Sequence, residues 1–157
     1  MRGICMKTGK RIGIILLSLV MLLTYGSFTV FAAEAPEEYQ AVEYLEDGSY
    51  IVTTLVIDTP LTRSSSVSGR KTVTKYSTSD VKQYALTLRA TFSYNGSSAT
   101  ATDASTSVTI YQNGWNCTDR NITKSGNRAT ANATFRNGLA VNYPSVTITC
   151  SPSGSLS

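Results

Sequence analysis

Few residues of this 157-residue chain could do chemistry: Cys117 and Cys150, many serines, and no histidine at all. Nucleophilic catalysis needs a base beside the nucleophile, and histidine is both the commonest such base and the commonest transition-metal ligand. Cys117 therefore lacks the partner that a catalytic cysteine requires. We expect a protein that is not an enzyme.

Carboxylates give no stronger indication of catalysis. Glycoside hydrolysis needs two carboxylates flanking one bond. The carboxylates after Gly48 are Asp58, Asp80, Asp103 and Asp119. Asp58 precedes Thr59-Pro60, and Asp80 and Asp103 lie in stretches rich in Ser and Thr. Carboxylates in such stretches usually accept hydrogen bonds from the backbone of a turn. Zinc would need Cys and His clusters, and no D-x-D-x-D-G calcium loop occurs. We expect no metal and no cofactor.

Aromatic residues are the remaining candidates for ligand contact. Trp115 and Tyr111, with Tyr76, Tyr94 and Tyr143, could form a platform that stacks on sugar rings. The alternative for Trp115 is a place in the core with its polar tip hydrogen-bonded. Tyr111 lies on the opposite face to Ile110 in a strand pattern and is the ring expected to be exposed.

The two cysteines are better explained as a structural pair. Cys150 shares strand parity with Val146 and Ile148, and Cys117 shares it with Trp115. If both faces point into one core, the sulfurs meet, and a bridge closing about 32 residues would contribute roughly 3–4 kcal/mol. We predict a Cys117–Cys150 disulfide, with two buried free thiols as the alternative.

The N-terminal segment resembles a secretory signal peptide. Four basic residues precede an apolar run from Ile12 to Leu23, and Val30-Phe31-Ala32 supplies small residues at the cleavage positions. We predict a signal peptide over residues 1–32, with cleavage after Ala35 as the second option and an uncleaved anchor as the alternative. The mature protein is then extracellular, with membrane contact only during export.

Charge divides the mature chain into two parts. Four of the 14 basic residues lie in the signal segment, so ten basic and ten acidic residues remain. Residues 33–48 form an acidic leader in which Pro36 to Asp47 is expected to be a short helix or disordered chain. The basic residues after Gly48 are scattered rather than clustered, which argues against nucleic acid. Expected partners are cell-wall or host glycans, or another protein.

Alternation with a period of two dominates the chain after Gly48, as in antiparallel sheet with one wet face. Asn95-Gly96, Asn113-Gly114 and Asn137-Gly138 are strong turn signals. Residues 49–157 are predicted to form a single antiparallel β-sandwich, with an immunoglobulin-like arrangement as one candidate and a small barrel as the alternative. The expected strands are Tyr50–Asp58, Lys71–Ser77, Gln83–Tyr94, Ser98–Thr102, Ser107–Gln112, Trp115–Thr123, Arg128–Arg136 and Ser145–Cys150.

The large apolar residues on the inward parity of these strands define the expected core. They are Ile51, Leu55, Val73, Leu86, Leu88, Phe92, Val108, Ile110, Trp115, Phe135, Val146 and Ile148.

Four stretches carry a resemblance: YLEDGSYIVTT from Tyr44, SGRKTVT from Ser68, TFSYNG from Thr91 and the VTITC that ends at Cys150. Together they resemble a group of small exported proteins of Firmicutes, over most of the mature chain. The resemblance implies an exported β-domain of a Gram-positive organism. It carries over no catalytic or binding residue.

Three functions are consistent with these expectations. The first is a secreted or surface-associated binding module that engages a glycan or a protein through one sheet face or its loops. The second is a secreted antagonist, bacteriocin-like or inhibitory. The third is a structural surface subunit in which exposed strand edges pair between copies.

Overall fold

The computed structural model describes residues 37–58 and 65–157. The predicted signal peptide, the first residues of the acidic leader and most of the loop after Asp58 lie outside the described residues. The described chain forms nine β-strands and no helix. Within it, no helix is long and apolar enough to cross a membrane.

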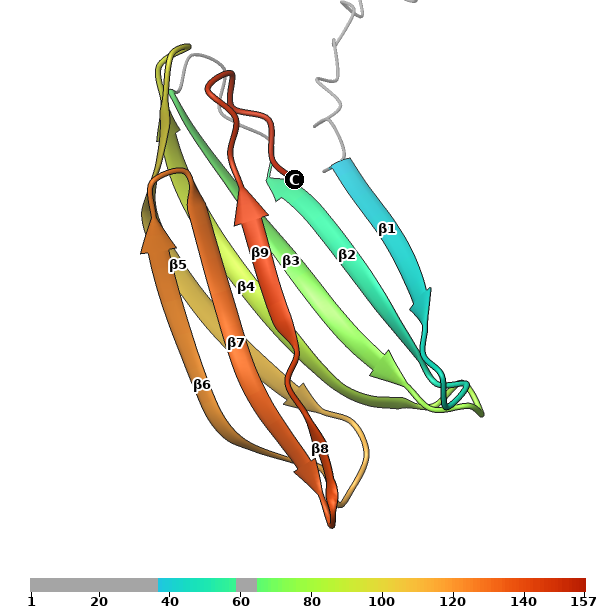
Figure 1. Cartoon of the computed structure of the whole chain (residues 1–157). Helices are drawn as coiled ribbons and strands as arrows, with labels where there is room; N and C mark the ends of the chain where they lie inside the picture. The colour runs from blue at the N-terminus through green and yellow to red at the C-terminus, as the bar shows by residue number, and fades with distance from the viewer. Residues whose placement is uncertain (1–36, 59–64) are drawn as a thin grey trace, which may run out of the picture. The chain divides into compact units, whose positions relative to one another are not determined.

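Sheet A is an antiparallel meander of five strands in the order β1-β2-β3-β4-β5 (Figure 1). Threonine and valine are frequent in these strands because β-branched side chains fit the pleated backbone. Gly48 and Gly96, in the turns after β1 and β4, have positive φ values of 77° and 86°, which suit glycine. The strands are Glu37–Tyr44 (β1), Tyr50–Asp58 (β2), Ser66–Tyr76 (β3), Lys82–Tyr94 (β4) and Ala99–Ile110 (β5).

Sheet B lies against sheet A and is centred on β7. Strand β6 pairs with one edge of β7, and β8 and β9 pair with its other edge at opposite ends. Strands that follow one another in the chain are neighbours in sheet A, and β6, β7 and β8 follow one another in sheet B. The described residues therefore contain none of the Greek-key connections typical of an immunoglobulin domain. The strands are Asn116–Ser125 (β6), Arg128–Asn137 (β7), Ala140–Asn142 (β8) and Ser145–Thr149 (β9).

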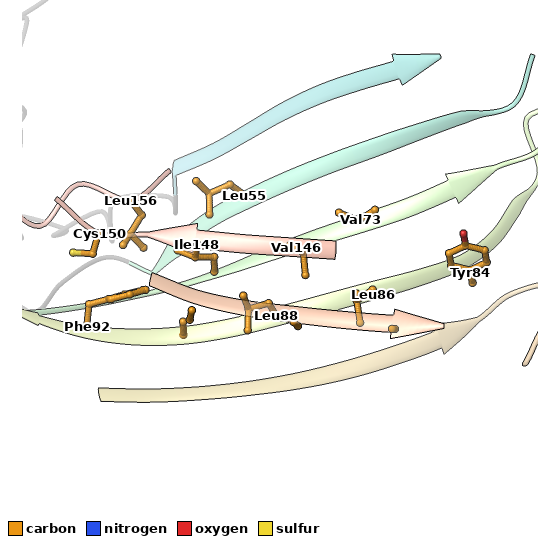
Figure 2. Packing of buried hydrophobic residues seen from close by; sticks show 14 of the residues in the cluster. Leu55, Val73, Tyr84, Leu86, Leu88, Phe92, Val146, Ile148, Cys150 and Leu156 are labelled. Atoms are coloured by element: carbon orange, nitrogen blue, oxygen red, sulfur yellow. The ribbon is translucent and has the colours of Figure 1, made fainter. Parts of the chain in front are cut away.

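The core lies between the two sheets, and the predicted alternation is confirmed there (Figure 2). Leu86, Leu88 and Phe92 of β4 are completely buried, as are Phe135 and Ile148 of sheet B. Ala129 and Ala131 of β7 are also fully buried, and their small size lets the two sheets approach closely. The architecture is an all-β sandwich of two antiparallel sheets, as the sequence predicted.

Three local expectations are wrong. The acidic stretch before Gly48 is not a helix, because β1 pairs with β2 from Glu37 to Tyr44 and satisfies its backbone in the sheet. The two short strands expected between Ser98 and Gln112 are one strand, β5, with a bulge opposite Thr91 and Phe92. Ile110, expected in the core, is 39% exposed because it is the last residue of that edge strand.

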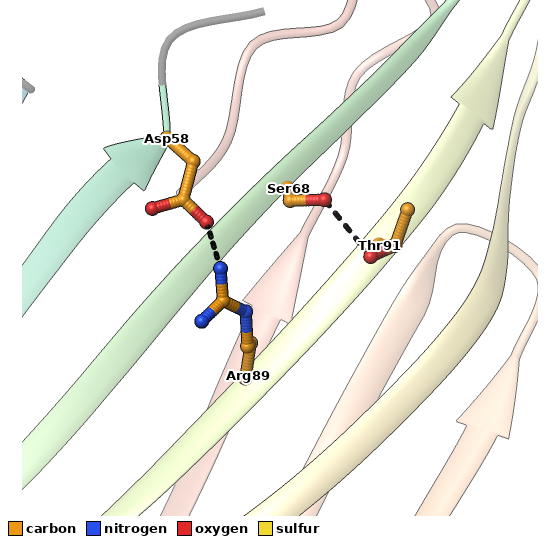
Figure 3. Close-up of polar contacts among 4 residues, drawn as sticks. All are labelled: Asp58, Ser68, Arg89 and Thr91. Atoms are coloured by element: carbon orange, nitrogen blue, oxygen red, sulfur yellow. Dashed lines mark hydrogen bonds and ion pairs between the residues drawn. The ribbon is translucent and has the colours of Figure 1, made fainter.

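The outer face of sheet A is held by polar cross-strand contacts (Figure 3). The Arg89 guanidinium lies 2.7 Å from the Asp58 carboxylate, and the Ser68 and Thr91 hydroxyls lie 2.9 Å apart. Thr72 and Thr87 make a similar hydroxyl pair at 2.9 Å. The threonines that alternate with apolar residues therefore form the solvent-facing side of sheet A, where they bond to each other, and they do not form a binding site.

Candidate functional site

The two aromatic residues predicted to contact a ligand lie in different environments. Tyr111 is 52% exposed, with the Lys82 ammonium 5.5 Å from its ring centroid. Trp115 is only 6% exposed, and its ring lies 4.9 Å from that of Tyr84. The Tyr111 ring is therefore accessible to a sugar. The Trp115 ring belongs to the edge of the core, as its alternative had it, but its indole N–H lacks the hydrogen bond that this alternative expected.

The predicted Cys117–Cys150 disulfide is wrong, and both thiols are free. Cys117 pairs with Phe135, whereas Cys150 follows Thr149, which pairs with Arg128. The stretch of β7 between those two partners, at about 3.3 Å per residue, is roughly 23 Å long. A disulfide needs Cα atoms within about 7 Å. Strand parity gave the faces of the two cysteines but not their positions along the sheet.

A cleft of about 290 Å³ lies beside Trp115 at the end of the sandwich where the turns after β1 and β3 meet β8. We call it the Trp115 cleft. Most of its lining residues are polar or charged, which distinguishes it from the core behind it. The lining residues are Asp47, Ser49, Lys75, Ser77, Thr78, Gln83, Trp115, Ala140 and Asn142.

The cleft brings a cation and an anion together. Lys75 is 8% exposed and occupies an inward position of β3, two residues after the core residue Val73. Hydrogen bonds from the Ser49 hydroxyl and backbone N–H hold the pKa of the Asp47 carboxyl below its ordinary value of 3.8, and the charge of Lys75 adds to this. The cleft therefore carries one basic and one acidic side chain, whose charges offset each other.

Two residues that line the cleft carry a buried polar atom without a hydrogen-bond partner in the described structure: Trp115 Nε1, a donor, and Gln83 Oε1, an acceptor. Both atoms are closed off from solvent. A buried polar group left unpaired costs about 1–3 kcal/mol, and such groups are rare enough to need an explanation. A ligand that reached both atoms and supplied an acceptor and a donor would remove both costs.

An aromatic row crosses the outer face of sheet A at the same end. The ring centroids of Tyr44 and Tyr50 lie 5.6 Å apart, and those of Tyr50 and Tyr76 lie 4.7 Å apart and almost parallel. Lys82 continues the row, with its ammonium 6.0 Å from the Tyr76 centroid. Cross-strand contacts between these rings stabilise the end of the sheet. They leave the outward side of Tyr44 free of ring contacts, and this residue is 76% exposed.

Sequence reasoning missed Lys75, Gln83 and Asp47 as site residues. Lys75 carried a usable signal, because it has the same strand parity as Val73 and a lysine at an inward position needs a polar surrounding. Gln83 and Asp47 carried none, since only the fold brings the β1–β2 turn beside the start of β4. Within the described ranges, no cluster of His, Cys, Asp and Glu could hold a metal ion.

Comparison with known proteins adds little to this geometry. No family model matches the chain, and no curated protein matches it. The crystal structure of a hypothetical protein from Listeria monocytogenes EGD-e aligns with a TM-score of 0.42 and 16% sequence identity. The alignment covers 74% of this chain and 88% of that one, and at this level of similarity it carries no functional argument.

Proposed function

We propose that this protein is an exported, non-catalytic binding module that holds an N-acetylated amino sugar in the Trp115 cleft. The observation that carries the proposal is that two residues lining one cleft, Trp115 and Gln83, bear an unpaired donor and an unpaired acceptor. The signal-peptide pattern supports export to a compartment where such sugars occur in cell walls and on host surfaces.

An acetamido group is complementary to these two atoms. Its carbonyl oxygen accepts from the Trp115 indole N–H, and its amide N–H donates to Gln83 Oε1. The hydroxyls of the sugar ring find a donor in Lys75 and an acceptor in Asp47, both of which line the same cleft. A neutral, hydroxyl-rich ligand suits a cleft whose two charges cancel.

The test compares a β-linked trimer of N-acetylglucosamine with the matching trimer of glucose by isothermal titration calorimetry. Only the first carries acetamido groups, so we expect heat of binding from it and none from the glucose trimer. Trp115→Phe keeps a ring against Tyr84 but removes the N–H, and it should weaken binding roughly 5- to 10-fold, the worth of one hydrogen bond.

Tyr143→Phe is the matched control, because that residue is 72% exposed and does not line the cleft. Thermal melts establish that each variant is folded; if Trp115→Phe is not, Gln83→Met removes the acceptor instead. Equal binding of the two trimers, or full affinity in both cleft variants, contradicts the proposal.

A further inference from the structure

Strand β1 is the only described strand without a buried or half-buried residue, although β6 has only one such residue. All eight of its residues are exposed, on both faces of the sheet. It forms the end of the sheet A order and contacts β2 alone among the described strands. In the part of the chain that the structure describes, β1 is therefore an open edge that sheet B does not cover.

The backbone of β1 offers a regular set of hydrogen-bonding groups. Leu45 N donates to Ser49 O just beyond the β1–β2 ladder, which marks that pair as a hydrogen-bonded one. Because such pairs alternate in antiparallel sheet, odd-numbered residues of β1 bond to β2. The N–H and C=O groups of Glu38, Gln40, Val42 and Tyr44 therefore point away from the sheet.

A groove of about 430 Å³ runs along the inner side of the same edge. Tyr39 pairs with Leu55, which is 6% exposed, and both line the groove together with Leu156 of the C-terminal segment. Tyr39 itself is 55% exposed and Val42, on the other face, is 50% exposed. An added strand would cover apolar surface on both faces of β1.

Charge decides which strand can be added. Strand β1 contains Glu37, Glu38 and Glu43 and no basic residue. Pairing with a second copy of β1 would gather six carboxylates along one ladder, and like charges placed opposite each other destabilise a sheet. An acidic edge of this kind resists self-association and favours a basic partner.

We propose that β1 is a docking edge for a basic, extended peptide segment of another protein, which adds to sheet A as an antiparallel sixth strand. The register follows from the side chains of β1. Basic residues belong opposite Glu43 and opposite the Glu38–Glu37 pair, with apolar residues opposite Val42 and Tyr39. An aromatic residue opposite Tyr44 extends the tyrosine row. The segment reads aromatic-basic-apolar-x-x-apolar-basic-basic.

The probe is a fluorescent peptide of that pattern, Tyr-Lys-Leu-Thr-Thr-Val-Lys-Lys, titrated with the purified protein and followed by fluorescence anisotropy. We expect saturable binding. N-methylation at the third, fifth and seventh peptide residues blocks the amides opposite Val42, Gln40 and Glu38 and should abolish it. N-methylation at the fourth and sixth residues leaves those bonds intact and should change the affinity less than threefold.

Charge-reversal variants separate docking from general attraction. The double variant Glu38→Lys/Glu43→Lys should weaken binding at least tenfold. Glu46→Lys, an exposed change outside the strand, is the control and should leave the affinity within twofold. Equal binding of the two N-methylated peptides, equal loss in Glu46→Lys, or a protein that elutes as a dimer through β1 would overturn the proposal.

Discussion

At the residue scale, Tyr84 places a polar hydroxyl group in the core of the sandwich. The Tyr84 ring is stacked on Phe135, with centroids 3.9 Å apart and planes 11° from parallel. The side chain is 2% exposed, and burial raises the pKa of its hydroxyl from 10.0 to about 12, although a hydrogen bond with Asn142 opposes the shift. The folded state therefore strongly prefers the neutral form of Tyr84.

This preference predicts a loss of stability in alkali. Tyr84 ionises at pH 10.0 in the unfolded chain but only near 12 in the folded one, so the unfolded state releases its proton first. The stabilising contribution is complete below pH 10 and is lost as the pH rises toward 12, at about 1.4 kcal/mol per pH unit. Tyr84→Phe has no hydroxyl to ionise and should lose about 1 kcal/mol less between pH 9 and pH 11.

Urea unfolding at the two pH values measures this difference. Tyr143→Phe is the control, since that hydroxyl is exposed and its removal should leave the alkaline loss unchanged. An equal alkaline loss in Tyr84→Phe and in the parent protein would contradict the assignment to Tyr84.

At the scale of elements, the C-terminal segment after β9 packs against the sandwich through Leu156. Cys150 and Leu156 form an antiparallel bridge, and Leu156 is 8% exposed over sheet A. A Cβ on Gly69 would lie 2.6 Å from Leu156 Cδ1, and a Cβ on Gly154 would lie 2.6 Å from the Tyr94 ring. Each glycine therefore makes room for a side chain of the neighbouring segment.

Gly154→Ala should consequently destabilise the protein more than an ordinary turn substitution. Gly154 has a φ of 91°, and Gly96 has a φ of 86° with no heavy atom within 4 Å of an added Cβ. Both substitutions carry the backbone strain, whereas only Gly154→Ala also displaces Tyr94. We expect Gly154→Ala to cost about 1–3 kcal/mol more than Gly96→Ala, as measured by chemical denaturation. Equal losses would place the whole effect in the backbone.

At the scale of the whole molecule, the sandwich is held by packing between its sheets, without a covalent link between the two described cysteines. Cys150 is completely buried, and its burial raises the pKa of its thiol, whereas Cys117 is partly exposed. The two lie at opposite ends of sheet B. Because the two thiols differ in exposure and lie far apart, each should react with a labelling reagent on its own.

Thiol labelling tests this arrangement. In protein purified without reductant, we expect iodoacetamide to modify Cys117 in the native state and to modify Cys150 only after denaturation, because alkylation requires an accessible thiolate. Peptide mapping by mass spectrometry reports each site. A cross-linked Cys117–Cys150 peptide, or rapid native labelling of Cys150, would contradict the structure.

The sequence by itself determined the all-β fold class and the side of the sheet on which most strand residues lie. Alternation assigned Leu86, Leu88 and Phe92 to the core, and it placed Tyr111 opposite Ile110 on a face where it is exposed. These properties are local, because a strand turns each successive side chain to the opposite face and glycine-containing turns interrupt the pattern. No pairing between strands has to be known to derive them.

Tertiary structure decided everything that depends on register. The stretch from Glu37 to Tyr44 has a helix-like composition, yet pairing with β2 makes it a strand. Parity could not place Cys117 and Cys150 at opposite ends of sheet B. The Trp115 cleft exists only because the β1–β2 turn folds beside β4 and β8. Such contacts join segments far apart in the chain, and their geometry is set by the packing of whole sheets rather than by neighbouring residues.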